Sequence, residues 1–227
     1  MKLRVIATGS KGNSYLLYND QECLIIEMGM PFMEVKKALD FDILRIVGGI
    51  CSHGHGDHYR YVKDYEKAGI TLLAPFQYID NCAIWGNFTI TGFKNPHGDT
   101  QSWGYFIKHH EMGKLIFITD FEYCPYDFSG QQVEHMMIEC NYQLDMVDTD
   151  APNFKHKIQG HCADTTCLEF IKHNNSSRLR TVTILHVGSG TIDEDLLINR
   201  IQSIVDSDVS VEIAKSGLEI ELRKDVF

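Results

Sequence analysis

Four side chains of the kind that bind metal ions lie within six positions of the segment SHGHGDH (52–58). His53 and His55 are two residues apart at the end of an extended, apolar segment, so both imidazoles can face one ion. Asp57 and His58 follow at the start of an expected helix and can face a second ion. Imidazole and carboxylate together suit zinc, manganese or iron. Because a surface turn gains nothing from such a cluster, the segment predicts a metal site.

Three more candidate ligands lie near strand ends further along the chain. His97 stands in NPHGDTQSWGYFI just before an expected strand, Asp120 ends the apolar run KLIFITD, and His186 lies near the end of TVTILHVG. Each alone has an ordinary explanation, since carboxylates are common in turns and buried histidines are often hydrogen-bonded. Together with the first cluster, they indicate a metal centre assembled at the strand ends.

The elements that must position these ligands are short and mostly extended. Period-two and apolar runs predict strands, and amphipathic segments predict helices. Strands are expected at 3–8, 14–18, 23–28, 47–52, 70–74, 87–93, 102–108, 114–119, 135–140, 181–187, 209–214 and 218–223. Helices are expected at 31–40, 58–69, 163–173 and 192–206, with a loop and a short helix within 141–160. This order predicts one α/β domain over residues 1–227, a four-layer αββα sandwich of two mixed sheets with outer helices.

Composition restricts the function. The 227 residues are 44% hydrophobic and have a formal net charge of -10, which disfavours a general nucleic-acid binder. No apolar run reaches the ~18–20 residues that a membrane span needs, and the N-terminal segment indicates a strand and not a signal peptide. Seven cysteines without a CxxC pair favour free thiols in a reducing cytoplasm.

The ordered pattern HxHxDH, followed by His, Asp and His after successive strands, resembles the metallo-β-lactamase fold superfamily over nearly the whole chain. Three segments point to its nuclease and phosphodiesterase branch. GSKGNSYLL resembles the opening of YycJ-like hydrolases, and HGDTQSWGYFI resembles a segment of transfer-RNA 3′-processing nucleases. GHCADTTCLEF resembles a helix start in the same branch.

The resemblance implies a role for each ligand. One divalent ion would take His53, His55 and His97, and the other would take Asp57, His58 and His186, with Asp120 bridging both. Zinc is the expected ion, and manganese or iron are alternatives.

Residues around the ligands also receive roles. His161 would be a catalytic histidine that binds no metal, and either His161 or Asp57 would protonate the leaving group. The remaining histidines (109, 110, 135, 156 and 173) match no motif and are taken as surface or packing residues. One departure concerns IIEMG, where Glu27 stands in place of the aspartate that supports the ligand loop in this superfamily. Its extra methylene requires a rearranged hydrogen-bond network around the ligands.

Two ions ~3.5–4 Å apart can generate a bridging hydroxide and neutralise charge on a phosphoryl oxygen. The branch resemblance therefore favours phosphodiester hydrolysis. Asp120 and His186 are 186 − 120 = 66 positions apart, which leaves no room for the extra domain of RNA-degrading relatives. The sequence is similar to compact phage enzymes that degrade cyclic mononucleotide signals. Alternatives are a YycJ-like or RNase Z-like DNA or RNA nuclease, a lactonase or thioesterase, and a metal-binding protein without activity.

Possible substrate contacts come from two turns. Lys11 and Asn13 belong to the GSKGNS turn, which could hold a phosphate or simply connect two strands, and Ser189 follows the last ligand. Four aromatic residues could stack on a base, although core packing is the favoured reading for most of them: Trp103, Tyr105, Trp85 and Phe76. The resemblance further implies a homodimer, in the host cytoplasm if the gene is phage-encoded, with a small phosphodiester substrate and no membrane partner.

Overall fold

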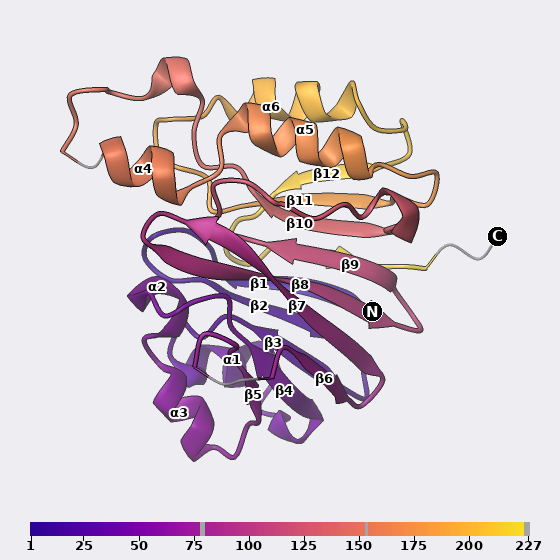
Figure 1. Ribbon diagram of the computed structural model, residues 1–227. Coiled ribbons are helices and arrows are strands. Elements are labelled where there is room, and N and C mark those ends of the chain that lie inside the picture. Colours follow the sequence, from indigo (N-terminus) through magenta and orange to yellow (C-terminus); the bar gives the residue numbers. More distant parts are fainter. Residues whose placement is uncertain (78–79, 153, 225–227) are drawn as a thin grey trace.

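Two mixed β-sheets pack face to face, and helices cover the outer face of each sheet (Figure 1). The computed structural model describes residues 1–77, 80–152 and 154–224. The four-layer αββα sandwich expected from the sequence is confirmed. In the described part of the chain, no helix combines the length and apolar character required to cross a membrane.

The first sheet has the strand order β13-β1-β2-β3-β4-β5. Its pairs are antiparallel from β13 to β3, and β4 and β5 continue it in parallel. Its strands are β1 (Lys2–Ala7), β2 (Ser14–Tyr18), β3 (Cys23–Ile26), β4 (Ile46–Ile50), β5 (Leu72–Leu73) and β13 (Glu219–Glu221).

The second sheet has the order β12-β11-β10-β9-β8-β7-β6. It is parallel from β12 to β9 and antiparallel from β9 to β6. Its strands are β6 (Cys82–Trp85), β7 (Phe88–His97), β8 (Thr100–His109), β9 (Gly113–Ile118), β10 (His135–Glu139), β11 (Thr181–Leu185) and β12 (Ser210–Ile213). The parallel strands β9, β10 and β11 therefore end at the same edge of the sheet.

The helices form the two outer layers. Those on the first sheet are α1 (Phe32–Ala38), α2 (Gly56–Tyr59) and α3 (Val62–Lys67), and those on the side of the second are α4 (Phe154–Gly160), α5 (Asp164–Asn174) and α6 (Glu194–Gln202) (Figure 1). Short 3₁₀ turns are η1 (Ile43–Arg45), η2 (Ser129–Gln131) and η3 (Leu144–Met146). The Asp193 carboxylate caps α6 by accepting a hydrogen bond from the Leu196 N–H.

Strand alternation explains why the two sheets are apolar on both faces. On β2, Leu17 packs between the sheets, while its neighbour Leu16 packs against the layer of α1 and α3. On β9, Phe117 lies between the sheets and Ile116 packs on the side of α5 and α6. All four side chains are buried. Each such burial contributes about 1.5–3 kcal/mol, which holds the layers in register.

Several boundaries differ from the sequence expectations. The strand predicted at 23–28 ends at Ile26, because Glu27 adopts a left-handed conformation with φ of 66°. The helix predicted at 58–69 is divided into α2 and α3, and at the break the Tyr61 N–H bonds the carbonyl of Met28. Strand β6 was not expected. His97 lies just before the expected strand, β8, and it also ends β7, which is longer than predicted and reaches the turn of the β7–β8 hairpin.

Candidate metal centre

The candidate ligands meet at one edge of the sandwich. His53 and His55 lie in the loop after β4, and His97 ends β7. Asp120 follows β9 and His186 follows β11, both at the edge where the parallel strands end. These last two residues have positive φ angles of 47° and 49°. Such backbone is costly for side-chain-bearing residues and is typical of functional sites.

Three imidazoles converge as the sequence predicted for the first ion. His53 Nε2 lies 2.9 Å from His55 Nδ1, and His97 Nε2 lies 3.1 Å from the same atom. Asp120 Oδ2 is 3.6 Å from His53 Nε2. Ligands on a tetrahedral zinc are about 3.3 Å apart, given zinc–nitrogen bonds of ~2.0–2.1 Å. The separations between these three ring nitrogens and the carboxylate oxygen are therefore those expected of ligands around one cation.

The protonation states support this fit. Burial lowers the pKa of His97 to about 4 and, together with the neighbouring imidazole of His58, holds the pKa of His53 well below its usual range. Although burial opposes ionisation of Asp120, the imidazoles of His186 and His58 hold its pKa well below the usual carboxyl range. For His53, His97 and Asp120, these are the forms that bind metal. Burial opposes protonation of His58 and His186, but nearby carboxylates raise the pKa of both, so these two imidazoles would release a proton on binding an ion.

The second set of ligands lies on the other side of Asp120. His58 Nε2 is 3.3 Å from both Asp57 Oδ2 and Asp120 Oδ2. His186 Nε2 is 3.9 Å from Asp57 Oδ2, and its Nδ1 is 2.5 Å from Asp120 Oδ1. The structure thus brings together all seven residues predicted as ligands, and the arrangement can hold divalent ions. Which ion each residue binds stays a prediction.

Glu27 supports the ligand loop from behind, as expected for the position. Its carboxylate accepts hydrogen bonds from the Ser52 N–H (3.1 Å) and the Cys51 thiol (3.0 Å), and it lies 3.4 Å from His58 Nδ1. Glu27 holds these contacts with a left-handed backbone, φ 66°. Two residues later, Gly29 allows the ligand loop to approach closely, since a Cβ there would lie 1.7 Å from the Asp57 carbonyl oxygen.

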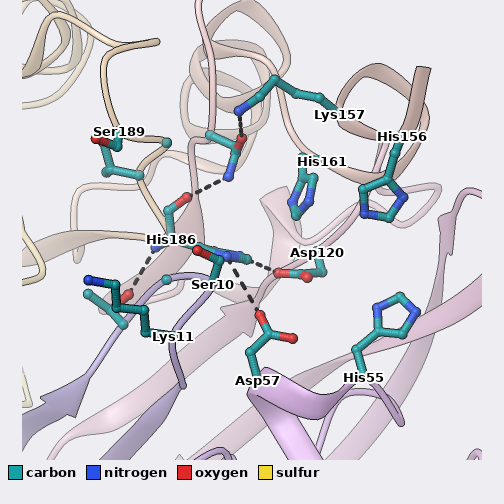
Figure 2. A pocket seen from close by; sticks show the side chains of 15 residues that line it. Ser10, Lys11, His55, Asp57, Asp120, His156, Lys157, His161, His186 and Ser189 are labelled. Carbon is teal, nitrogen blue, oxygen red and sulfur yellow. Dashed lines mark hydrogen bonds and ion pairs between the residues drawn. The ribbon is translucent and has the colours of Figure 1, made fainter. Parts of the chain in front are cut away.

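A cavity of about 470 Å³ opens over the centre and is lined by ligands and by two predicted substrate contacts, Lys11 and Ser189 (Figure 2). Asn13, also predicted to contact the substrate, lies elsewhere. Its side chain is fully buried, accepts from the Gly9 N–H (2.8 Å) and donates to His58 Nε2 (3.0 Å). Asn13 therefore ties the first turn to a ligand and does not face the cavity.

Comparisons with known proteins agree with this geometry. A model of the metallo-beta-lactamase superfamily matches residues 7–77. YhfI from Bacillus subtilis, itself a metallo-beta-lactamase fold protein, is similar in structure, with a TM-score of 0.71, 17% identity and coverage of 96% of this chain and 98% of YhfI. The chain has the metallo-β-lactamase fold. The resemblance predicted from the ligand pattern is thereby confirmed.

Other structures share the metallo-β-lactamase fold at similar distance. The short form of human tRNase Z has a TM-score of 0.63 and 16% identity, covering 98% of this chain and 99% of its own. A diphosphatase of the PhnP family has a TM-score of 0.65 and 12% identity, covering 99% of both chains. No curated protein matches the chain by sequence.

His161 lies within this candidate metal centre, and it has a partner that the sequence did not indicate. Its Nδ1 donates a hydrogen bond of 2.7 Å to Glu139 Oε1 at the end of β10. Although burial alone would lower it, the Glu139 carboxylate raises the pKa of His161 to about 9. The imidazole is therefore protonated at neutral pH. Its ring centroid is 5.1 Å from that of His186, which places this acid beside the ligands.

Helix α4 contributes two further residues that sequence reasoning missed. His156, which had been taken as a surface or packing residue, lines the cavity, with its ring 6.5 Å from that of His55 (Figure 2). Lys157 lines the same cavity and donates to Asn141 Oδ1 at 2.8 Å. The sequence offered no signal for either, because the region 141–160 has weak periodicity and its fold depends on tertiary contacts.

Proposed function

We propose that the chain is a metal-dependent phosphodiester hydrolase, with two zinc ions, or manganese or iron, and with small cyclic mononucleotides as substrates. The proposal depends chiefly on the Glu139–His161 pair. When a sugar phosphodiester is hydrolysed, the sugar oxygen leaves as an alkoxide, which is strongly basic and needs a proton. A histidine held protonated beside the ligand cluster supplies one.

Bound divalent ions would supply an activated water and offset charge on the phosphoryl oxygens. The residues of the chain do the remaining work. Asp120 and the imidazoles around it would hold the ions that position the phosphate, and Lys11 and Lys157 add positive charge to the cavity wall. His161 then donates the Nε2 proton to the leaving oxygen, and Glu139 stabilises the imidazolium before the transfer. Proton donation of this kind contributes typically ~10²–10⁴ in rate.

The preference for a small substrate follows from charge and topology. A chain with a net charge of -10 repels a long polyanion outside a focused site. The segment between Asp120 and His186 is occupied by β10, α4, α5 and β11, which are elements of the sandwich and its covering layer. A cyclic mononucleotide needs only the cavity itself.

The test is a chromatographic assay of metal-loaded protein. The substrates are a panel of cyclic mononucleotides, a single-stranded RNA and a homoserine lactone, with a chelator and Asp120→Ala as controls. We expect linear monophosphates from the cyclic panel, with the RNA and the lactone unchanged. An opened lactone with every phosphodiester intact would contradict the proposal.

A nuclease is the second candidate, because the fold is shared with the short form of human tRNase Z. This reading predicts RNA shortened by the same protein preparation. Its affinity for RNA should fall steeply with salt, since each phosphate contact releases counterions. A cyclic mononucleotide, with one phosphate, should show a much shallower dependence.

A further inference from the structure

A second cavity, of about 590 Å³, opens on the centre beside the first. His55 lines both cavities and His53 lines the second, so the second cavity borders the metal ligands directly. The second cavity is otherwise different in chemistry. Its apolar lining comes from Pro75, Phe76 and Trp103, and its polar lining comes from Lys94, Thr100 and Gln101. An apolar wall with a few convergent polar groups is typical of a site for a small organic group.

The aromatic side chains of this second cavity are arranged to receive a ring. Phe76 is half-buried and is held by Tyr59, with centroids 5.1 Å apart and planes at 78°. Gly54, between the two ligands His53 and His55, has no side chain to cover Phe76. Trp103 carries the Lys94 ammonium 5.4 Å from its ring centroid. A flat ligand can therefore lie against Phe76, with the largely buried Trp103 and the Lys94 ammonium at its rim.

The other two aromatic residues considered from the sequence do not serve this purpose. The hydroxyl of Tyr105 donates to the Cys51 carbonyl at 2.6 Å, and the side chain is fully buried. Trp85 packs so closely on Gly48 that a Cβ there would lie 2.1 Å from its ring. Of the four candidates, Phe76 and Trp103 alone line this cavity.

We propose that the second cavity binds the nucleobase of a nucleotide whose phosphate lies at the metal ligands. The proposal rests on the proposed function and deepens it by assigning the place where the base of the nucleotide binds. Stacking on an aromatic ring tolerates any base, whereas the Gln101 amide can hydrogen-bond a base edge as donor and acceptor. Lys94 would contribute a cation near the ring without binding the scissile phosphate.

The first experiment measures binding and does not depend on turnover. The chain has two tryptophans, so Trp85→Phe leaves Trp103 as the fluorescent reporter. Adenosine 5′-monophosphate and ribose 5-phosphate are titrated with and without metal. We expect saturable quenching by the nucleotide but not by the sugar phosphate. Phe76→Ala should lower the affinity for the nucleotide by about 10-fold, because one stacking contact is lost.

Controls keep the result interpretable. Phe76→Leu preserves apolar volume but removes stacking, and it should weaken binding in the same direction. Phe41→Ala, at a phenylalanine that is 64% exposed and does not line the cavity, should bind as the parent does. Equal quenching by both ligands, or no effect of either change at Phe76, would overturn the proposal.

A kinetic experiment separates this proposal from the proposed function. Thymidine 5′-(4-nitrophenyl phosphate) and methyl 4-nitrophenyl phosphate share a leaving group and differ in the base. Phe76→Ala should raise KM about 10-fold for the first ester and leave the second unchanged. If both esters are hydrolysed and the change affects them equally, the base site is wrong. If neither ester is hydrolysed and the cyclic mononucleotides are also unchanged, the proposed function fails, and the binding experiment alone decides the base site.

Discussion

Among the described residues, two His–Glu pairs have similarly short nitrogen–oxygen distances, and one of these two lies in a cavity with the metal ligands. His161 donates to Glu139 at 2.7 Å beside the metal ligands. His109, the last residue of β8, pairs with Glu22 at 2.9 Å, and both side chains are buried. The difference lies in what else each pair contacts.

At the Glu22 pair every polar atom is committed. Asn87 donates to Glu22 from its backbone N–H (2.8 Å) and from its side chain (2.7 Å), and the Glu111 N–H donates to His109 Nδ1. At the Glu139 pair, His161 Nε2 has no hydrogen-bond partner within residues 1–77, 80–152 and 154–224, and the ring lines the cavity. A His–Glu pair can therefore act on a bound ligand when the second ring nitrogen of its histidine faces a cavity, as that of His161 does.

The largest effect should come from disrupting the candidate metal centre beside the Glu139–His161 pair. Asp120→Ala removes the carboxylate that lies between the two sets of imidazoles, so hydrolysis should fall to background. Metal content, measured by mass spectrometry of the dialysed protein, should fall below two ions per chain. Retention of both ions and of turnover would show that Asp120 does not bridge them.

The next effect tests the pair itself. His161→Gln should lower kcat for a cyclic mononucleotide by about 10²–10⁴, because the leaving alkoxide loses its proton donor. Esters of 4-nitrophenol, whose leaving group needs no proton, should change little. His109→Gln is the matched control and should leave both rates unchanged. Equal losses with both substrates would indicate a structural role for His161.

A third histidine, His135, extends the comparison because it forms no ion pair with a carboxylate in the part of the chain that the structure describes. Its Nε2 donates a hydrogen bond to the Met112 carbonyl (3.0 Å), its Nδ1 lies 2.9 Å from Thr181 Oγ1, and burial lowers its pKa to about 4. The unfolded chain therefore binds a proton that the native state does not. Stability should fall as pH decreases from about 6.5 to about 4, by on the order of 3 kcal/mol.

Urea unfolding at several pH values measures this loss, and the difference in slope between the parent and His135→Gln isolates the contribution of His135 from that of the other histidines. Identical slopes in the two proteins would mean that His135 does not remain neutral in the native state.

The smallest effect should come from the structural pair. His109→Ala leaves the Glu22 carboxylate buried with fewer partners, so the free energy of unfolding should drop by roughly 1–3 kcal/mol. Urea denaturation measures it, with Lys2→Ala as a control for an exposed ion pair, whose loss should be smaller because solvent screens it. A loss no larger than that of the control would show that Asn87 alone satisfies Glu22.

These histidines also show how far the sequence reaches. The ligands and the fold class could be predicted because HxHxDH is local and because strand ends follow from apolar runs. His161 could be placed only through resemblance, and Glu139 not at all, since their pairing depends on where β10 and α4 meet. Asn13 was predicted to contact the substrate, but its side chain is buried, for a similar reason. A turn residue can face outward or inward, and its hydrogen bond to His58 Nε2 forms only in the folded chain.

Helix α4 has a consequence for how binding events depend on each other. Its last residue, Gly160, accepts a hydrogen bond at its carbonyl from Nδ1 of the ligand His97, and His161 follows immediately. His156 and Lys157 of the same helix line the cavity. A substrate that orders this helix must also favour the bound orientation of His97. Thermodynamic reciprocity then requires that the substrate raises the affinity for the ion by the same factor by which the ion raises the affinity for the substrate.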